Sequence, residues 1–342
     1  MRILNRDDVA AALTDREPAV LDAVRAAYLL HGQGRSRVPF SGFLRPPEPD
    51  GSRIISLPAY LGGPEPVMGM KWISSFPGNV DEGLQRASSV LVLNDLRTGY
   101  PVALLEGSRI SASRTAASAA LASAALHGAC AVRTAALIGC GTINQRVLAF
   151  LARTHPELEA VLLHDAVPDR AEVLAAELRR LHPGIAFRTG DAAAALSART
   201  VSVATTDSSY WLDLASYPQR PDGQVILHLS LRDLSTASVL AAHNVVDDTE
   251  HAVREHTSLH MAEQEVGNRD FVHAEIASVL DGSVRPDTAG TTVFSPFGLG
   301  ILDLAVAREV LGSAIRAGLG TEVGGFAPGS HRVTAAMTEK SA

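Results

Sequence analysis

The predicted fold of this chain is decided by ten residues, AALIGCGTIN, which run from Ala135 to Asn144. The first four are an apolar run typical of a buried strand, and a Gly-x-Gly turn then leads into a helix that we expect to begin near Ile143. Gly139 permits the tight turn, and Gly141 lets the backbone approach a pyrophosphate at the positive end of the helix. Asn144 stands where the usual third glycine would be, so this stretch alone leaves a nucleotide site and an ordinary strand–helix turn both open.

The next predicted strand, Leu158–Asp165, favours the nucleotide site. It is apolar and ends in an acid, Asp165, about twenty positions beyond the glycine turn, which is the spacing of the ribose-binding acid in dinucleotide folds. An acid there can hydrogen-bond both ribose hydroxyls and would repel a 2′-phosphate. We therefore expect NAD rather than NADP, the alternative being that Asp165 only caps the following helix.

Composition limits the classes of protein to which the chain can belong. Its 342 residues are 46% hydrophobic and 20% charged, which is typical of a globular chain of about two domains. The net charge of −7 argues against nucleic acid or an anionic membrane as the main partner. No apolar stretch has transmembrane length, the N-terminus does not resemble a signal peptide, and the two cysteines predict a reduced, cytoplasmic protein without structural zinc.

The N-terminal part predicts a mixed α+β domain. An amphipathic helical opening over residues 5–31 is followed by predicted strands. These cover residues 37–45, 53–58, 67–73, 89–94 and 101–106.

An alanine-rich helix, expected from Ala112 to His127 and closed by Gly128, follows this domain. We expect Arg114 in its first turn, where a cation opposes the helix dipole unless an anion also sits there. Arg114 and the free amide groups would then form a seat for a carboxylate or phosphate. The alternative is that Arg114 pairs with a structural acid such as Glu106.

From Thr134 onward, predicted strands and helices alternate, which indicates a parallel sheet with helices on both faces. The predicted fold class is α/β: a Rossmann-type, doubly wound parallel sheet plus an α+β substrate-binding and dimerisation domain. We assign residues 119–304 to the NAD-binding domain and residues 1–118 with 305–342 to the other. Ligands should lie beyond the carboxyl ends of the parallel strands.

Several charged residues could meet at that edge. Lys71 lies within an apolar strand, where burying an ammonium group is costly unless it faces an anion. Asp233 follows a predicted strand near the expected nicotinamide and could hold an amine or act as a base, or it could be a surface residue capping the helix at Ser235. Arg86 and Arg232 are weaker candidates. The histidines at 251, 256 and 260 share one predicted helix, but we expect no metal site.

These motifs together resemble the ornithine cyclodeaminase/mu-crystallin family over roughly residues 37–305. The motifs that carry the resemblance are Lys71, the turn from Asn94 to Pro101, Arg114-Thr115-Ala116-Ala117, Gly139-Cys140-Gly141, Asp165, Asp233 and Gly298 with Asp303. Three segments are similar to the branch that makes 2,3-diaminopropionate from an amino-carboxyethyl glutamate. They are residues 71–79, residues 139–144 with Asn144, and Ser230-Leu231-Arg232-Asp233.

The resemblance implies a homodimer with a Rossmann domain for NAD and a first domain that binds an amino-acid substrate and pairs the subunits. It assigns catalysis to Asp233 and Lys71. The expected substrate contacts are Lys71, Arg114, Arg45, Arg86 and Arg232. The expected cofactor contacts are Arg114, Gly139, Gly141, Thr142, Ile143, Asn144, Asp165, Thr205, Thr206, Ser230, Leu231, Phe297 and Gly298.

Departures from the family pattern speak against ornithine cyclisation. The arginine that cyclodeaminases place after the proline equivalent to Pro39 is Phe40 here, which leaves Arg37 or Arg45 as stand-ins. Cyclodeaminases have a lysine four residues after the catalytic aspartate, where this chain has Ala237. They have a serine at the position of Pro296.

The expected reaction is NAD-dependent oxidative hydrolysis of N-(2-amino-2-carboxyethyl)-L-glutamate to 2,3-diaminopropionate and 2-oxoglutarate, a step that supplies siderophores or peptide antibiotics. The alternatives are another oxidoreductase of the family (a cyclodeaminase, an alanine dehydrogenase or a cyclic-imine reductase) and a non-catalytic nucleotide- and ligand-binding protein.

Overall fold

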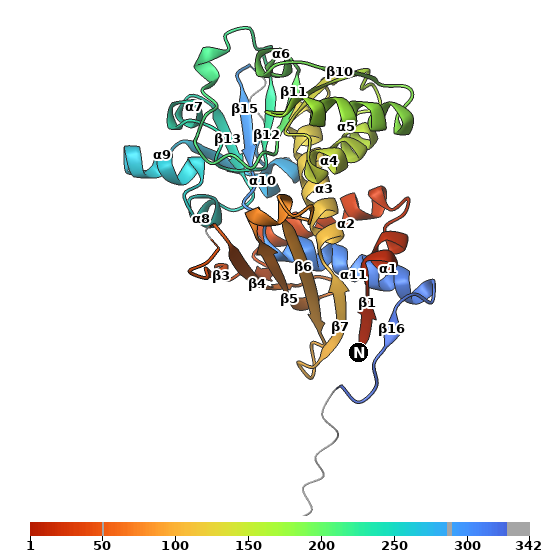
Figure 1. The fold of residues 1–342 in the computed structure, drawn as a ribbon. Coiled ribbons are helices and arrows are strands. Elements are labelled where there is room, and N and C mark those ends of the chain that lie inside the picture. The colour runs from red at the N-terminus through yellow and green to blue at the C-terminus, as the bar shows by residue number, and fades with distance from the viewer. Residues whose placement is uncertain (50, 286–288, 327–342) are drawn as a thin grey trace, which may run out of the picture.

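A computed structural model describes residues 1–49, 51–285 and 289–326 of the chain. Two sheets, one parallel and one mixed, form the upper and lower parts of the view in Figure 1. This arrangement confirms the predicted α/β class, with a doubly wound parallel sheet beside a second, mixed α+β unit.

The parallel sheet has eight strands in the order β10-β9-β8-β11-β12-β15-β13-β14. Its first five positions follow the Rossmann order, so the order of the strands reverses between β8 and β11, and in such sheets dinucleotides bind at the carboxyl ends at this point. The strands are β8 (Thr134–Ile138), β9 (Ala160–His164), β10 (Ala186–Thr189), β11 (Thr200–Val203), β12 (Val225–His228), β13 (His243–Val246), β14 (Val272–Glu275) and β15 (Thr292–Ser295). β11, β12 and β15 are buried along their whole length, as expected of central parallel strands.

Helices lie on both faces of this sheet (Figure 1). They are α4 (Thr142–Thr154), α5 (Pro168–Leu181), α6 (Ala192–Leu196), α7 (Thr236–Leu240), α8 (Thr249–Ala252), α9 (Ser258–Val266) and α10 (Ile276–Leu280), with a 3₁₀ turn η2 (Leu214–Ser216). α5 begins with Pro168, whose fixed φ suits the first position of a helix.

The mixed sheet has the order β16-β1-β7-β6-β5-β4-β2, with β3 also paired to β4. Its strands are β1 (Arg2–Leu4), β2 (Ser36–Arg37), β3 (Gly42–Leu44), β4 (Arg53–Leu61), β5 (Val67–Ser75), β6 (Ala87–Asn94), β7 (Pro101–Glu106) and β16 (Thr321–Glu322), with a 3₁₀ turn η1 (Pro77–Val80). α1 (Arg6–Ala12), α2 (Glu17–Gly32) and α11 (Gly300–Arg316) belong to this half of the molecule, and α11 packs against β4 and β5.

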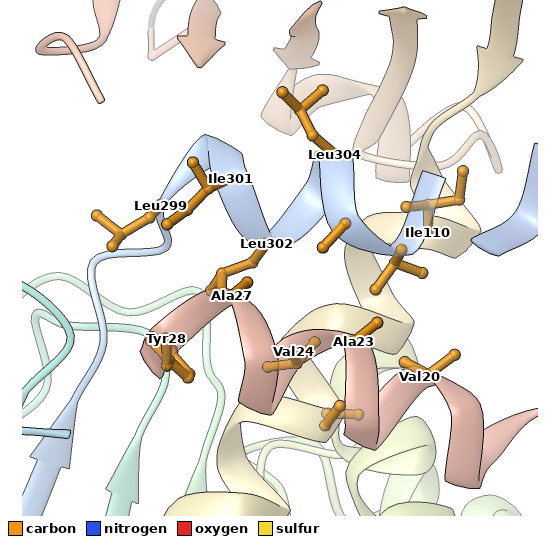
Figure 2. Close-up of a cluster of buried hydrophobic side chains, with 14 of the residues drawn as sticks. Val20, Ala23, Val24, Ala27, Tyr28, Ile110, Leu299, Ile301, Leu302 and Leu304 are labelled. Carbon is orange, nitrogen blue, oxygen red and sulfur yellow. The ribbon is translucent and has the colours of Figure 1, made fainter. Parts of the chain in front are cut away.

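The long helix α3 (Ser108–His127) joins the two sheets. Figure 2 shows α2, α3 and α11 meeting through small and medium apolar side chains, among them Val24, Ile110 and Leu302. The same buried cluster includes Leu91 of the mixed sheet and Phe294 of the parallel sheet. The core is therefore continuous from one sheet to the other, which fixes the walls of any site between them.

Two predicted elements differ from the structure. The helical opening is two helices, because the chain turns between Leu13 and Arg16. α3 begins at Ser108 rather than Ala112, because the Glu106 carboxylate accepts hydrogen bonds from the backbone amides of Ser108 (2.7 Å) and Arg109 (3.3 Å).

The predicted domain boundaries fall inside two continuous helices. The boundary after residue 118 lies within α3, and the boundary after residue 304 lies within α11. Residues 327–342 of the assigned range lie outside the described residues. We retain the two-domain division as a proposal, with these helices shared between the halves. Among the described residues, no helix combines the length and the apolar character that crossing a bilayer requires.

Candidate active site

The turn after β8 needs glycine at its first position. Gly139 has φ +89°, and a Cβ there would lie 2.3 Å from the carbonyl oxygen of Ala204. Gly141 is the N-cap of α4, without a side-chain cap, and a Cβ built on it meets no described atom within 4 Å. Gly141 and Thr142 are both exposed, and a first helical turn with free amide groups at this point fits the pyrophosphate of a dinucleotide.

Asn144 supports this turn from beneath. Its side chain is fully buried, and Nδ2 donates to the carbonyl oxygens of Ile138 (2.9 Å) and Gly139 (2.7 Å). The hydroxyl of Ser202 on β11 donates to Asn144 Oδ1 (2.6 Å). The amide thus joins β8, the turn and β11. The predicted direct contact between Asn144 and a cofactor is corrected to a supporting role, because none of the residue is exposed to a ligand.

Asp165, at the end of β9, lies beside the same turn. Its Oδ2 accepts the backbone amide of Cys140 (2.7 Å), and its Oδ1 accepts that of Val167 (2.9 Å). Burial, and then the nearby Asp165 carboxylate, raise the pKa of the Cys140 thiol to about 12. Val167, not Asp165, is the N-cap of α5, so the capping alternative is wrong. Asp165 remains half-buried at the carboxyl edge, where an adenosine ribose would lie.

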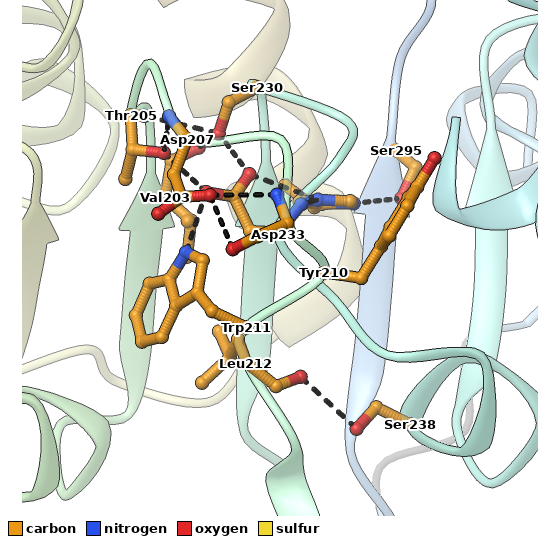
Figure 3. A network of polar contacts seen from close by, with 12 residues as sticks. Val203, Thr205, Asp207, Tyr210, Trp211, Leu212, Ser230, Asp233, Ser238 and Ser295 are labelled. Carbon is orange, nitrogen blue, oxygen red and sulfur yellow. Dashed lines mark hydrogen bonds and ion pairs between the residues drawn. The ribbon is translucent and has the colours of Figure 1, made fainter. Parts of the chain in front are cut away.

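Asp233, in the loop after β12, is fully buried (Figure 3). Its Oδ1 accepts hydrogen bonds from the hydroxyl of Thr205 and from Nε1 of Trp211 (3.3 Å), and its Oδ2 accepts one from the hydroxyl of Ser230. The alternative of a surface residue capping α7 is wrong, because Ser235 makes that cap. The carboxylate is thus fixed in one orientation by three donors.

A buried histidine lies beneath this carboxylate. His228 Nε2 is 3.4 Å from Asp233 Oδ2 and accepts the Asp233 backbone amide (3.3 Å), while Nδ1 lies 3.1 Å from the Ser295 hydroxyl. Burial alone would raise the pKa of Asp233, but its interactions with His228, followed by the hydrogen bonds from Ser230 and Thr205, hold the pKa below its usual range. Asp233 is therefore ionised at neutral pH and able to accept a proton.

A pocket of about 610 Å³ lies next to this network. It brings together predicted residues from both halves of the chain: Arg45, Arg86, Thr205, Thr206, Ser230 and Arg232. Arg53 also lines it and was missed, because one arginine at the start of an apolar strand gives no signal in the sequence. Of the two candidate stand-ins, Arg45 is in the pocket, whereas Arg37 donates to the carbonyl oxygens of Gly34 (3.2 Å) and Ser36 (2.6 Å).

The four guanidinium groups of this pocket are unequally paired. Arg45 forms an ion pair with Glu255 (2.6 Å), and Arg232 donates to the Glu255 carbonyl oxygen (2.6 Å). Burial, and then the charges of Arg232, Arg86 and Arg45, lower the pKa of Arg53. Burial, followed by Arg232, also lowers the pKa of Arg86. The lining therefore carries four arginines against two carboxylates, Asp207 and Glu255, and this positive excess suits an anionic ligand.

Lys71 and Arg114 form a separate buried group. Lys71 Nζ lies 2.7 Å from Asp303 Oδ2, and Arg114 Nε lies 3.1 Å from Asp303 Oδ1. Burial lowers the pKa of Lys71 to about 8. The negative charge of Asp303 acts against this shift, and the positive charge of Arg114 adds to it. Arg114 is in the second turn of α3, so the predicted seat of free amide groups is wrong, and its acid partner is Asp303 rather than Glu106.

The loop after β15 lies against Arg114. Gly298 has φ +97°, and a Cβ there would come within 2.8 Å of Arg114 Nη1. The buried Asp247 carboxylate accepts the backbone amides of Phe297 (2.8 Å) and Gly298 (2.7 Å). This explains how Phe297 and Gly298 are held. Among the described residues, the lining of the arginine pocket does not include Lys71, Arg114, Phe297 or Gly298.

Sequence reasoning missed two residues of the Asp233 network. Trp211 lies in the loop after β11 and reaches Asp233 only through the fold. His228 could have been noticed, because it is a polar residue at the end of an otherwise apolar strand. The predicted helix with three histidines is wrong: His251 is on α8, His260 is on α9, and His256 lies between them. Within the described ranges no His, Cys, Asp or Glu group is arranged to hold a metal.

A comparison with family models matches residues 4–216 to the ornithine cyclodeaminase/mu-crystallin family. Among curated proteins, the N-((2S)-2-amino-2-carboxyethyl)-L-glutamate dehydrogenase of Staphylococcus aureus is 28% identical, over 94% of this chain and 97% of that protein.

Solved structures agree over the whole fold. The Thermococcus litoralis Δ¹-pyrroline-2-carboxylate reductase, in complex with NADH and L-proline, superposes with a TM-score of 0.86 at 27% identity and covers 94% of this chain and 100% of its own. An archaeal alanine dehydrogenase dimer with bound NAD superposes with a TM-score of 0.84 at 25% identity. The match covers 94% of this chain and 98% of the alanine dehydrogenase chain. The chain therefore belongs to the ornithine cyclodeaminase/mu-crystallin family, a family of NAD(P)-dependent amino-acid dehydrogenases and reductases.

Proposed function

We propose that this protein catalyses the NAD-dependent oxidation of N-(2-amino-2-carboxyethyl)-L-glutamate, with hydrolysis to 2,3-diaminopropionate and 2-oxoglutarate. The observation that carries the proposal is the ionised, buried Asp233 beside a pocket with four arginines at the carboxyl edge of a Rossmann sheet. The 28% identity to the Staphylococcus aureus enzyme supports the choice of substrate.

The reaction balances as substrate, NAD⁺ and water giving the two products, NADH and a proton. When bound, NAD supplies an acceptor for the hydride that leaves the α-carbon of the glutamate part. The secondary amine must lose its proton before that carbon–hydrogen bond breaks, so that its lone pair can form the imine. Water then adds to the imine carbon, and the C–N bond breaks to release the amine of 2,3-diaminopropionate.

Asp233 takes the amine proton in this scheme. The carboxylate is fully buried, but the hydroxyls of Thr205 and Ser230 both line the pocket and donate to it. A hydroxyl can accept the proton of the substrate ammonium while passing its own proton to Asp233. The same route returns a proton to the leaving amine when the C–N bond breaks.

The charge of the pocket supports a substrate with several carboxylates. The proposed substrate carries three, whereas alanine and proline carry one each. Four guanidinium groups would be an expensive arrangement for a single carboxylate, because the excess like charges repel one another. Phe40, Ala237 and Pro296 further separate this chain from the cyclodeaminase pattern described above. The centroid of the Phe40 ring lies 3.4 Å from Arg254 Cζ. Phe40 therefore packs against a cation and does not supply one.

NAD is the proposed cofactor because Asp165 stands at the ribose position. Its carboxylate would repel a 2′-phosphate, and the first turn of α4 offers the amide groups for the pyrophosphate. We also keep the proposed cytoplasmic location and the supply of siderophore or antibiotic synthesis as parts of this hypothesis.

The test is an anaerobic incubation of the protein with NAD and the synthetic adduct, following NADH absorbance and identifying both products by mass spectrometry. The adduct should be oxidised far faster than alanine, proline or ornithine. Faster reduction of Δ¹-pyrroline-2-carboxylate with NADH would favour the reductase alternative instead. No reduction of NAD with any amino acid would leave the ligand-binding alternative.

We further propose that the protein is a homodimer paired through the mixed sheet. Lys71 of β5 reaches Asp303 of α11, so the next residue, Trp72, points to the opposite face of the mixed sheet. Strand register puts Val90 and Val102 on that same face, and the three side chains are between 39% and 41% exposed. Trp72 and Val90 are direct cross-strand partners, so the apolar surface is continuous. Light scattering should give twice the chain mass for the parent protein and the single mass for Val90→Glu. A monomeric parent protein would overturn the pairing.

A further inference from the structure

The four pocket arginines divide into two pairs by what holds them. Arg45 and Arg232 are tied to Glu255, through its carboxylate and its carbonyl oxygen. Arg53 and Arg86 form no side-chain hydrogen bond or ion pair with the described residues, and Arg86 Nε is buried without a partner. A buried guanidinium N–H without an acceptor is costly, which indicates that a ligand supplies the acceptor.

Strand register sets the spacing of this second pair. Arg53 begins β4 opposite Ser75 of β5, and Ser75 pairs in turn with Ala87 of β6, next to Arg86. Two strand spacings of about 4.8 Å place the two arginine backbones roughly 10 Å apart. Both side chains reach the same pocket, so an anion between them can be contacted from two sides.

Other charges around the pair do not neutralise it. Glu255 is already engaged by Arg45, although its charge still acts on Arg53. Asp207 also lines the pocket, but its carboxylate accepts the amide (2.7 Å) and hydroxyl (2.6 Å) of Ser209. Burial, and then the charges of neighbouring arginines, lower the pKa of both Arg53 and Arg86, so an anion bound between them would relieve this repulsion.

We propose that Arg53 and Arg86 form a subsite for the distal carboxylate of a dicarboxylic acid, so that the pocket selects a glutamate-type chain over one that ends in a methyl group. The inference rests on the proposed function for the identity of the ligand, and it adds the residues that bind the distal carboxylate of that ligand. A guanidinium pair suits this task, because each group offers parallel N–H donors to a carboxylate.

Binding without turnover tests the subsite. The full-length protein, with NADH present, is titrated calorimetrically with 2-oxoglutarate and with 2-oxopentanoate, which has a methyl group in place of the distal carboxylate. The parent protein should bind 2-oxoglutarate at least tenfold more tightly. Arg53→Gln and Arg86→Gln should each remove most of that preference while changing 2-oxopentanoate binding less than threefold. Arg97→Gln, an exposed arginine in the turn between β6 and β7, is the matched control and should leave both affinities unchanged.

The substitutions should not unfold the protein, because each removes one of several repelling charges. We expect the Tm of Arg53→Gln to equal or exceed that of the parent. Equal binding of the two acids by the parent, or an equal loss for both acids in the variants, would overturn the subsite. Competition of inorganic phosphate or pyrophosphate with 2-oxoglutarate in the parent, lost in both variants, would reassign the pair to phosphate groups and also overturn it.

The outcome separates this inference from the proposed reaction. If the synthetic adduct is not oxidised but the dicarboxylate preference depends on Arg53 and Arg86, the reaction is wrong and the subsite stands. If the adduct is oxidised at a rate that neither variant changes, the reaction stands and the subsite is wrong.

Discussion

Replacing Asp233 with asparagine should remove catalysis while leaving the fold intact. An asparagine oxygen at the Oδ1 position keeps the hydrogen bonds from Thr205 and Trp211. The amide nitrogen then takes the Oδ2 position and donates to Ser230, whose hydroxyl can donate instead to the Val203 carbonyl oxygen at 3.2 Å. The partners of Asp233 keep their hydrogen bonds, so the free energy of unfolding should fall by only about 1 kcal/mol.

The catalytic loss should be much larger. The amide cannot accept a proton, and removal of a general base typically costs about 100- to 10,000-fold in rate, or roughly 3–5.5 kcal/mol of barrier. The assay is the initial rate of NADH formation with the adduct, together with NADH binding by fluorescence and a urea unfolding curve. NADH affinity should change by less than a factor of about three, because Asp233 lies outside the glycine turn.

Asp222→Asn, at an exposed position before β12, is the matched control and should retain the parent rate. A rate for Asp233→Asn within tenfold of the parent would refute the role of Asp233. Loss of folding would refute the expectation that asparagine at position 233 keeps the hydrogen bonds of this network. The pH profile gives an independent check: because hydrogen bonding holds the pKa of Asp233 below its usual range, kcat/KM should stay level through neutral pH and fall as the pH drops through that lowered pKa.

Four further predictions concern the neighbouring groups. Gly139→Ala should cost at least about 1–3 kcal/mol of stability and weaken NADH binding, both measurable by thermal unfolding and fluorescence titration, because φ +89° and the close carbonyl exclude a Cβ; parent-like values would contradict this. Asp303→Asn should destabilise the fold by about 3–5 kcal/mol in urea, since it leaves two buried cations, Lys71 and Arg114, without their carboxylate. Because burial lowers the pKa of Lys71 to about 8, against 10.5 for the free side chain, the unfolded chain binds more protons between these values, and the contribution of Lys71 to stability should rise with pH across that window. Asp165→Ser should raise the preference for NADP relative to NAD at least tenfold in kcat/KM ratios; an unchanged ratio would argue against the ribose contact.

Local pattern predicted the parts of the site that lie on one stretch of chain. The glycine turn, the acid at the end of β9 and the order of strands and helices follow from apolar runs and turn residues, whose conformations depend on near neighbours. The apolar pattern predicts the start of α3 too late, because the residue that caps the helix, Glu106, precedes that pattern. That error put Arg114 in the first turn and gave it the wrong partner.

Contacts between distant segments could not be predicted in this way. Asp303 lies far from Lys71 and Arg114 in the chain, and its charge alone does not say that α11 carries it to both cations. Asn144 was expected to touch the cofactor, but its neighbours Ile138 and Ser202 leave it no exposed surface. Burial of this kind depends on which elements pack together.

The sequence by itself determined that a Rossmann sheet would carry a dinucleotide turn and that Asp233 would follow one of its strands. These features depend on hydrophobic periodicity and backbone freedom, which neighbouring residues set. Only the tertiary structure decided that Arg53 joins Arg86 in one pocket, and that the hydroxyls of Thr205 and Ser230 donate to the buried Asp233 carboxylate. Those arrangements arise because packing one sheet against the other brings together side chains that are remote in the chain.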